Sequence, residues 1–145
     1  MSSVQHSNPS GAVPPYRDLF SSVTIVPPNT TLAYVSTQWA GDQDSNVLHP
    51  DDYYGQAKVI WTNIGTILGE LGAGVKDIVH RVVKFKEFDD EIGGAVVAAV
   101  MEALPGEDEY WWQSSLAFAQ VAGFHKPGIV YTVSVAIAMQ WNTRY

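Results

Sequence analysis

Apolar and polar residues recur with two clear periods along this chain of 145 residues, and these periods predict its elements. Helical spacing, with an apolar residue every three to four positions, predicts one helix opening at residues 50–52 and a second opening at 89–91. Alternating or β-branched segments predict strands, bounded by glycine, proline or asparagine, over 19–26, 31–38, 78–88, 114–122 and 129–139.

The two predicted helices each carry an apolar stripe between a capping signal and a stop signal. In the first, Gly72 and Gly74 supply the stop, and the stripe is formed by Ala57, Ile60, Trp61, Ile64, Ile67, Leu68 and Leu71. In the second, Asp89 opens the helix and the sequence Pro105-Gly106 ends it. Its buried side is predicted to hold Ile92, Ala95, Val96, Val100, Met101 and Leu104.

The resulting order, β-β-α-β-α-β-β, predicts an α+β domain with both helices on one face of a mixed sheet. Strands 19–26 and 31–38 are expected to form a hairpin. Residues 1–15 read as a flexible N-terminal tail and 16–145 as a single domain. Because the chain offers no third helix, a partner subunit is the expected cover for the other face of the sheet.

Composition narrows the classes of partner. A net charge of −7 with eight lysines and arginines argues against nucleic acid, which requires clustered cations. The chain has no cysteine, no apolar run long enough to span a bilayer and no secretory signal, so we expect a cytoplasmic protein without membrane contact. The four histidines lack helical metal-ligand spacing, so neither a metal nor another cofactor is expected.

Several short motifs, in order and at consistent spacing, carry a resemblance to a known family. They are Tyr34-Val35-Ser36-Thr37-Gln38, Gln56-Ala57, Asn63, Leu71-Gly72-Ala73 and Asp77-Ile78-Val79. Together they resemble the Rid family (reactive-intermediate deaminases, also called YjgF-type or L-PSP proteins) over about residues 16 to 140. The resemblance implies a chorismate-mutase-like fold, a homotrimer with clefts between subunits, and hydrolysis of enamines and imines.

The chain departs from the family where charged working groups would stand. The arginine that binds the substrate carboxylate corresponds to Leu116, the nearby cysteine to Phe118, and the water-positioning glutamate to Val133. No arginine lies between residues 82 and 143, and no acidic residue follows Glu109. The family's asparagine corresponds to Ala95 or a neighbour. A guanidinium supplied by Arg17 or Arg81 of an adjoining chain would restore the missing charge.

Other site positions are retained or become aromatic. Ser36 is kept, the next glycine is replaced by Thr37, and the aromatic residue of the first segment corresponds to Phe20 or Tyr16. A cleft without its anion clamp suits a larger, more apolar guest, because an unpaired buried carboxylate costs several kcal/mol. Its walls and neutral hydrogen-bonding groups are expected to include Gln38, Trp39, Trp111, Trp112 and Gln113. Ordinary packing remains the alternative for each tryptophan.

Catalytic candidates are few. His80, on a predicted strand, is a candidate general base, and Glu107 and Glu109 lie on a loop that approaches the family's cleft. A structural histidine and a solvated acidic loop are the competing interpretations.

The function we expect is a divergent, trimeric Rid-like enzyme that acts on a small, relatively apolar molecule in an inter-subunit cleft. Hydrolysis, dehydration, isomerisation or cyclisation fit this cleft, and tailoring of a natural product is one such role. One alternative is a non-catalytic trimer that binds a small molecule or a protein. Another is an imine deaminase with a relocated arginine. The negative charge argues against the RNA cleavage that has also been linked to this family.

Overall fold

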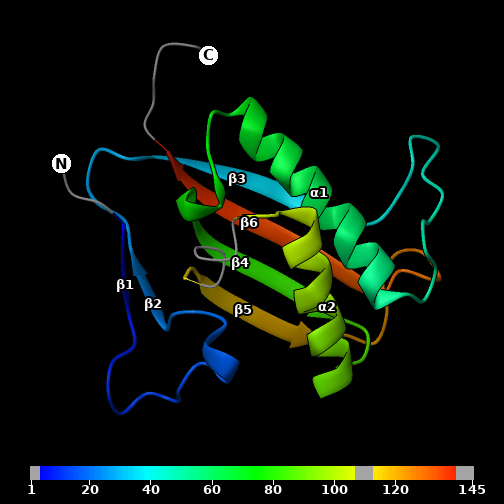
Figure 1. Cartoon of the computed structure of the whole chain (residues 1–145), viewed down its shortest axis with the longest axis horizontal. Coiled ribbons are helices and arrows are strands. Elements are labelled where there is room, and N and C mark those ends of the chain that lie inside the picture. Colours follow the sequence, from blue (N-terminus) through cyan, green and yellow to red (C-terminus); the bar gives the residue numbers. More distant parts are fainter. Residues whose placement is uncertain (1–3, 107–112, 140–145) are drawn as a thin grey trace.

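The computed structural model describes residues 4–106 and 113–139, which form two α-helices and six strands (Figure 1). Helices α1 (Tyr53–Glu70) and α2 (Asp90–Ala103) lie side by side on one face of a sheet. The sheet has the strand order β3-β6-β4-β5, with bounds Thr31–Gln38, Tyr131–Met139, Ile78–Phe85 and Ser115–Gln120. In this part of the chain no helix is long and apolar enough to span a bilayer.

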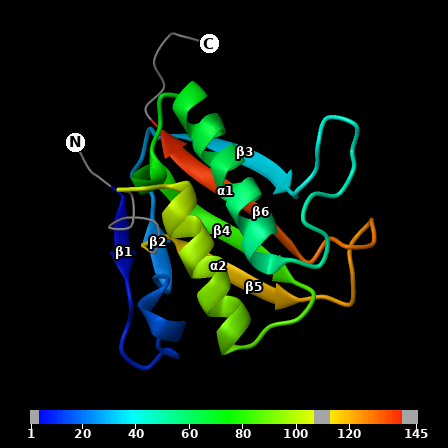
Figure 2. The same ribbon diagram turned by 45° about the vertical axis from the view of Figure 1, so that its right-hand side comes forward.

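The sheet is mixed, as predicted. Strand β6 pairs antiparallel with both β3 and β4, whereas β5 runs parallel to β4 at the sheet edge. Because β4 lies between β5 and β6 in the sheet, the segment 121–130 that joins these two strands is a crossover connection and not a hairpin turn. Figure 2, turned by 45°, shows the same two layers, with the helices covering one face of the sheet.

The predicted hairpin of strands 19–26 and 31–38 is wrong. Strand β2 (Val23–Ile25) pairs instead with β1 (Gln5–Ser7), which lies in the segment predicted as a tail, and the two form a separate small sheet. Pro27 and Pro28 follow β2 and supply no backbone N–H for a ladder, and Asn29 has a positive φ of 61°. Strand β3, the other half of the predicted hairpin, pairs antiparallel with β6 instead.

The core lies between the helices and the sheet. The predicted stripe of α1 is buried there, including Ile60, Trp61 and Ile64, and it packs on alternate residues of β6 such as Val133 and Ile137. The caps predicted for the helices are also present, because Asp52 accepts a hydrogen bond from the Gly55 N–H and Asp89 accepts one from the Ile92 N–H.

Gln56, a residue of the motifs quoted above, is fully buried, and its side chain hydrogen-bonds to the backbone of two loops. Its Nε2 donates to the carbonyl oxygens of His49, at 3.0 Å, and Gly128, at 2.7 Å. Its Oε1 accepts from the Val130 N–H at 3.0 Å. The side chain therefore satisfies the backbone of two loops that would otherwise bury unpaired polar groups.

Candidate functional site

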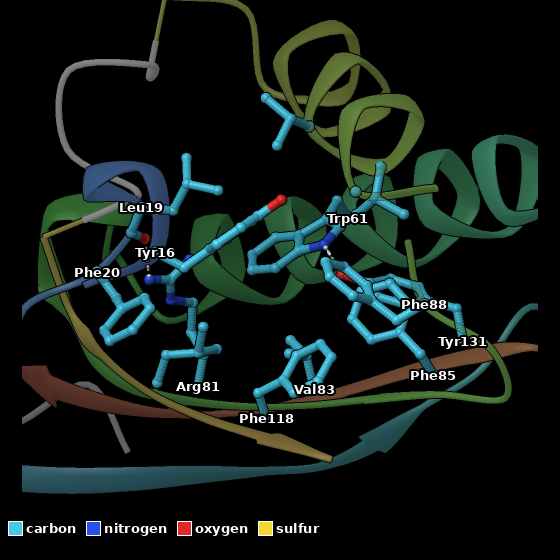
Figure 3. Close-up of a pocket in the computed structure, with 14 residues that line it drawn as sticks. Tyr16, Leu19, Phe20, Trp61, Arg81, Val83, Phe85, Phe88, Phe118 and Tyr131 are labelled. Atoms are coloured by element: carbon cyan, nitrogen blue, oxygen red, sulfur yellow. Dashed lines mark hydrogen bonds between the residues drawn. The ribbon is translucent and has the colours of Figure 1, made fainter. Parts of the chain in front are cut away.

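A cavity opens between the sheet, α2 and the N-terminal segment that includes the short 3-10 helix Tyr16–Asp18 (Figure 3). About 80 Å³ of it can be reached by a water-sized sphere, which is below the usual volume of small-molecule sites, and part of it is open to solvent. The lining is mostly apolar and is formed by Tyr16, Leu19, Phe20, Trp61, Arg81, Val83, Phe85, Phe88, Gly93, Val96, Val97, Leu116, Phe118 and Tyr131.

Aromatic rings form one wall of this cavity. Phe85 on β4 lies at its centre, with ring centroids 5.1 Å from Phe88, 5.2 Å from Phe118 and 4.9 Å from Tyr131. Phe88 in turn contacts Tyr16 edge-on at 6.0 Å. Such edge-on and tilted pairs add to the energy of burial and hold the rings in defined positions.

Two polar aromatic side chains meet at the floor of the cavity. The Trp61 Nε1–H donates to the Tyr131 hydroxyl oxygen at 3.0 Å, from α1 to β6 (Figure 3). Tyr131 is only 2% exposed, and burial raises the pKa of its hydroxyl to about 12. The hydroxyl therefore keeps its proton throughout the physiological pH range.

Arg81 is the charged residue of the lining and comes from β4. It lies directly across from Leu116 of β5 in the parallel ladder. Its Nη2 donates to the carbonyl oxygens of Leu19, at 2.7 Å, and Ser114, at 3.2 Å. The residue is 2% exposed, and desolvation lowers the pKa of its guanidinium to about 10, so it remains charged at neutral pH.

The roof over the cavity is held in place from two sides. The Arg81 guanidinium binds the carbonyl of Leu19, and the Tyr16 hydroxyl donates to the Asp90 carboxylate at the start of α2. The N-terminal segment is thereby fixed over the sheet and against the helix.

The cavity brings together several of the residues that the sequence predicts for the site. Phe20, Leu116 and Phe118 line it, together with Tyr16, the other candidate for the aromatic of the first segment. In α2, the lining includes Gly93, Val96 and Val97, which are neighbours of Ala95, the residue predicted to correspond to the family's asparagine. Val133 lies on the same face of the sheet but is fully buried in the core beside Val83, outside the lining.

The predicted polar group of β3 lies elsewhere. Thr37, Gln38 and Trp39 line a shallow groove with Gly41, Asp42 and Asn63, and Ser36 is exposed. Trp39 packs edge-on against His125, with ring centroids 5.0 Å apart, and Lys126 lies 5.6 Å from its ring. In the single chain these residues and the cavity form two separate sites.

His80 lies on the opposite face of the sheet from the cavity, because it alternates with Arg81 along β4. Its Nδ1 is 2.7 Å from the Ser115 hydroxyl, which also donates to the Val79 carbonyl oxygen. Gln113 is exposed. Four predicted site residues, Glu107, Glu109, Trp111 and Trp112, fall outside the described residues.

Among the described lining residues there is no aspartate, glutamate or histidine. In the same part of the chain no three such side chains gather as metal ligands do. These side chains therefore offer an apolar surface of defined shape, one guanidinium group and the hydroxyl groups of two tyrosines.

The sequence pointed to Arg81, but as a residue supplied by an adjoining chain, and it did not single out Trp61 or Tyr131 as site residues; all three line the cavity of one chain. Trp61 lies in the stripe predicted for the first helix, Arg81 shares the inner face of β4 with Val83 and Phe85, and Tyr131 lies on the buried face of β6. The signal was the presence of polar-tipped side chains on otherwise apolar buried faces, since such tips need partners.

Comparison with known proteins identifies the fold. No family model and no curated protein matches the sequence. A Rid-family protein of unknown function from Yersinia pestis has a TM-score of 0.73 at 13% identity, over 94% of this chain and 98% of that one. RidA from Psychrobacter sp. has a TM-score of 0.58 at 24% identity, with coverage of 96% and 100%.

A third structure, a member of the YjgF family from Mycobacterium tuberculosis, has a TM-score of 0.54 at 18% identity, covering 94% of this chain and 100% of that one. The chain thus has the α+β fold of the Rid/YjgF structures, and the predicted fold class is confirmed. The resemblance inferred from the motifs holds at the level of the fold.

Proposed function

We propose that the protein is a divergent Rid-like enzyme that acts on a small, relatively apolar organic substrate and not on 2-imino acids. The observation that supports this proposal is the mostly apolar cavity lining, which includes Leu116 and Phe118, the residues that the sequence comparison aligns with the family's arginine and cysteine. Arg81 supplies a charge nearby, but its Nη2 is engaged by two backbone carbonyls. A substrate carboxylate would therefore compete with structural hydrogen bonds.

The assembly that we propose is a homotrimer with the site completed at the subunit boundary. Phe118 lines the cavity yet is 46% exposed, so the wall is open on this side in the single chain. The face of the sheet turned away from the helices also exposes Leu32 and Tyr34. A neighbouring chain that covers these residues would exclude water from the cavity, and it could bring Glu107, Glu109 or His80 to the substrate as acid or base.

Hydrolysis, dehydration, isomerisation and cyclisation all suit such a site, because orientation in a dry cavity can lower their barriers. The negative charge of the chain makes nucleic acid a poor substrate, and no cofactor or membrane is required by this proposal.

The first test compares substrate classes. Imines freshly generated from amino acids should release ammonia no faster with the protein than without it. In a thermal-shift screen, small aromatic or polycyclic neutral compounds should raise the unfolding temperature more than 2-oxo acids do. Robust ammonia release would refute the proposal.

A matched pair of variants locates the binding. Phe118→Ala should weaken binding of the apolar compounds about tenfold, since it removes part of the cavity wall. Met101, predicted on the buried side of α2, is 40% exposed and lies outside the lining, so Met101→Ala should leave this binding unchanged. Equal effects of the two substitutions would place the ligand elsewhere. Binding without turnover of any compound would favour a non-catalytic binding protein.

One observation favours a second candidate, an imine deaminase with a relocated arginine. Arg81 is the ladder partner of Leu116, so a guanidinium stands one strand away from the family's position and faces the same cavity. Under this alternative Arg81→Lys would abolish ammonia release, because an ammonium group does not reproduce a bidentate contact with a carboxylate.

A further inference from the structure

The hydroxyl of Tyr131 is a polar group at the floor of a mostly apolar cavity. Its oxygen accepts the Trp61 N–H, and within residues 4–106 and 113–139 no acceptor takes up its own proton. A buried hydroxyl donor without an acceptor costs free energy that a bound group could recover. The side chain is 2% exposed and borders the empty space directly.

The geometry also fixes the direction of this donor. Because the Trp61 Nε1–H occupies one side of the phenolic oxygen, the hydroxyl proton is directed away from the indole nitrogen. Accepting one hydrogen bond polarises the O–H bond and strengthens it as a donor. Phe85, packed 4.9 Å from the Tyr131 ring, limits movement of the phenol.

We infer that the Tyr131 hydroxyl is the hydrogen-bond donor that orients a neutral carbonyl-type oxygen of the ligand in this cavity. The inference deepens the proposed function and rests on it, since it requires that the cavity bind a small apolar molecule. The Tyr131 O–H matches one neutral acceptor, whereas a carboxylate would also require the Arg81 guanidinium, whose Nη2 already donates to two backbone carbonyls. The donor stays protonated, because burial holds the pKa of Tyr131 near 12.

Three probes of one shape test this inference. Acetophenone carries a carbonyl group, α-methylstyrene replaces that oxygen by a methylene group, and benzoate replaces the methyl ketone by a carboxylate. Affinities are measured by NMR titration or calorimetry for the wild-type protein and for Tyr131→Phe. The matched control is Tyr53→Phe, which also removes a hydroxyl that accepts a backbone N–H, that of Glu87, but lies outside the lining.

We expect Tyr131→Phe to lower the affinity for acetophenone about tenfold, which corresponds to the loss of one hydrogen bond. The affinity for α-methylstyrene should not change. Tyr53→Phe should alter neither. If both neutral probes bind and Tyr131→Phe affects them equally, the inference fails while the apolar site stands. If no neutral probe binds, both the inference and the proposed function fail. Selective binding of benzoate would support the relocated arginine instead.

A second measurement does not depend on a substitution, because Tyr131→Phe leaves the Trp61 N–H without its acceptor and can destabilise the fold. The carbonyl stretch of carbon-13-labelled acetophenone, bound to the wild-type protein, should lie at a lower frequency than in hexane. A hexane-like frequency for the bound probe would overturn the inference.

Discussion

At the scale of single residues, Arg81 both stabilises the fold, through hydrogen bonds to two backbone carbonyls, and lines the cavity. Its side chain is buried under the helices, where an isolated cation is costly, and desolvation accordingly lowers the pKa of the guanidinium. The two carbonyls that it binds belong to Leu19 and Ser114, which lie far apart in the sequence. The same residue thus fastens the roof of the cavity to the edge of the sheet.

Arg81→Met tests this structural role. The substitution removes the cost of burying a charge but takes a donor from the carbonyls of Leu19 and Ser114. The Ser114 carbonyl keeps the Ser21 N–H, at 3.3 Å, whereas the part-buried Leu19 carbonyl loses its Arg81 donor, at about 1–3 kcal/mol. We expect the loss to dominate and the free energy of unfolding to fall by about 2 kcal/mol, measured by urea titration. Lys84→Met, at an exposed position of the same strand, should change it by no more than about 0.5 kcal/mol. A more stable Arg81→Met protein would show that desolvation outweighs the hydrogen bonds.

At the scale of elements, α2 carries two adjacent glycines that differ in their surroundings. A Cβ atom on Gly94 would meet no other atom within 4 Å. A Cβ atom on Gly93 would lie 3.2 Å from the Cε2 and Cζ atoms of Phe88, a ring that lines the cavity. The helix therefore has one glycine of no evident packing role and one that leaves room for an aromatic wall.

The two glycines of α2 predict different effects of alanine substitution on stability and on ligand binding. Gly94→Ala should raise the free energy of unfolding by about 0.5–1 kcal/mol, because alanine restricts the unfolded chain and favours the helix. Gly93→Ala should gain less, and it should weaken acetophenone binding several-fold by displacing Phe88 toward the cavity. Chemical denaturation and probe titration on the two variants check this. Equal probe affinities would contradict it.

The elements themselves were largely predictable, because both helices and the four sheet strands have strong periods and, for Asp52 and Asp89, clear caps. The pairing of β1 with β2 was not, since Gln5–Ser7 is too short and polar to show a period. The cavity floor could not be assembled either. Trp61, Arg81 and Tyr131 come from three elements whose contact depends on the strand order, which periodicity does not determine.

At the scale of the whole molecule, the two faces of the sheet differ. The inner face is covered by α1 and α2, whereas the outer face leaves Tyr34 77% exposed beside a row of small side chains on β6, including Ala136 and Ser134. Exposed aromatic side chains such as Tyr34 are enriched at subunit contacts.

The proposed trimer predicts a solution mass of three times the chain mass of 15.9 kDa, measured by light scattering. Tyr34→Glu, which places a charge on the outer face, should lower that mass. Met101→Glu, on the helix layer, should not lower it. A wild-type protein with the mass of one chain would refute the trimer.

The segment 16–20 that covers the cavity offers a place to change its ligand selectivity. Residues 16–20 contribute Tyr16, Leu19 and Phe20 to the cavity lining, yet this stretch is no part of the four-stranded sheet, and hydrogen bonds at Tyr16 and Leu19 help to hold it. Selectivity could therefore be redesigned by grafting a different short segment at this one place. The scaffold beneath, with its strand ladder and helix pair, would be left as it is.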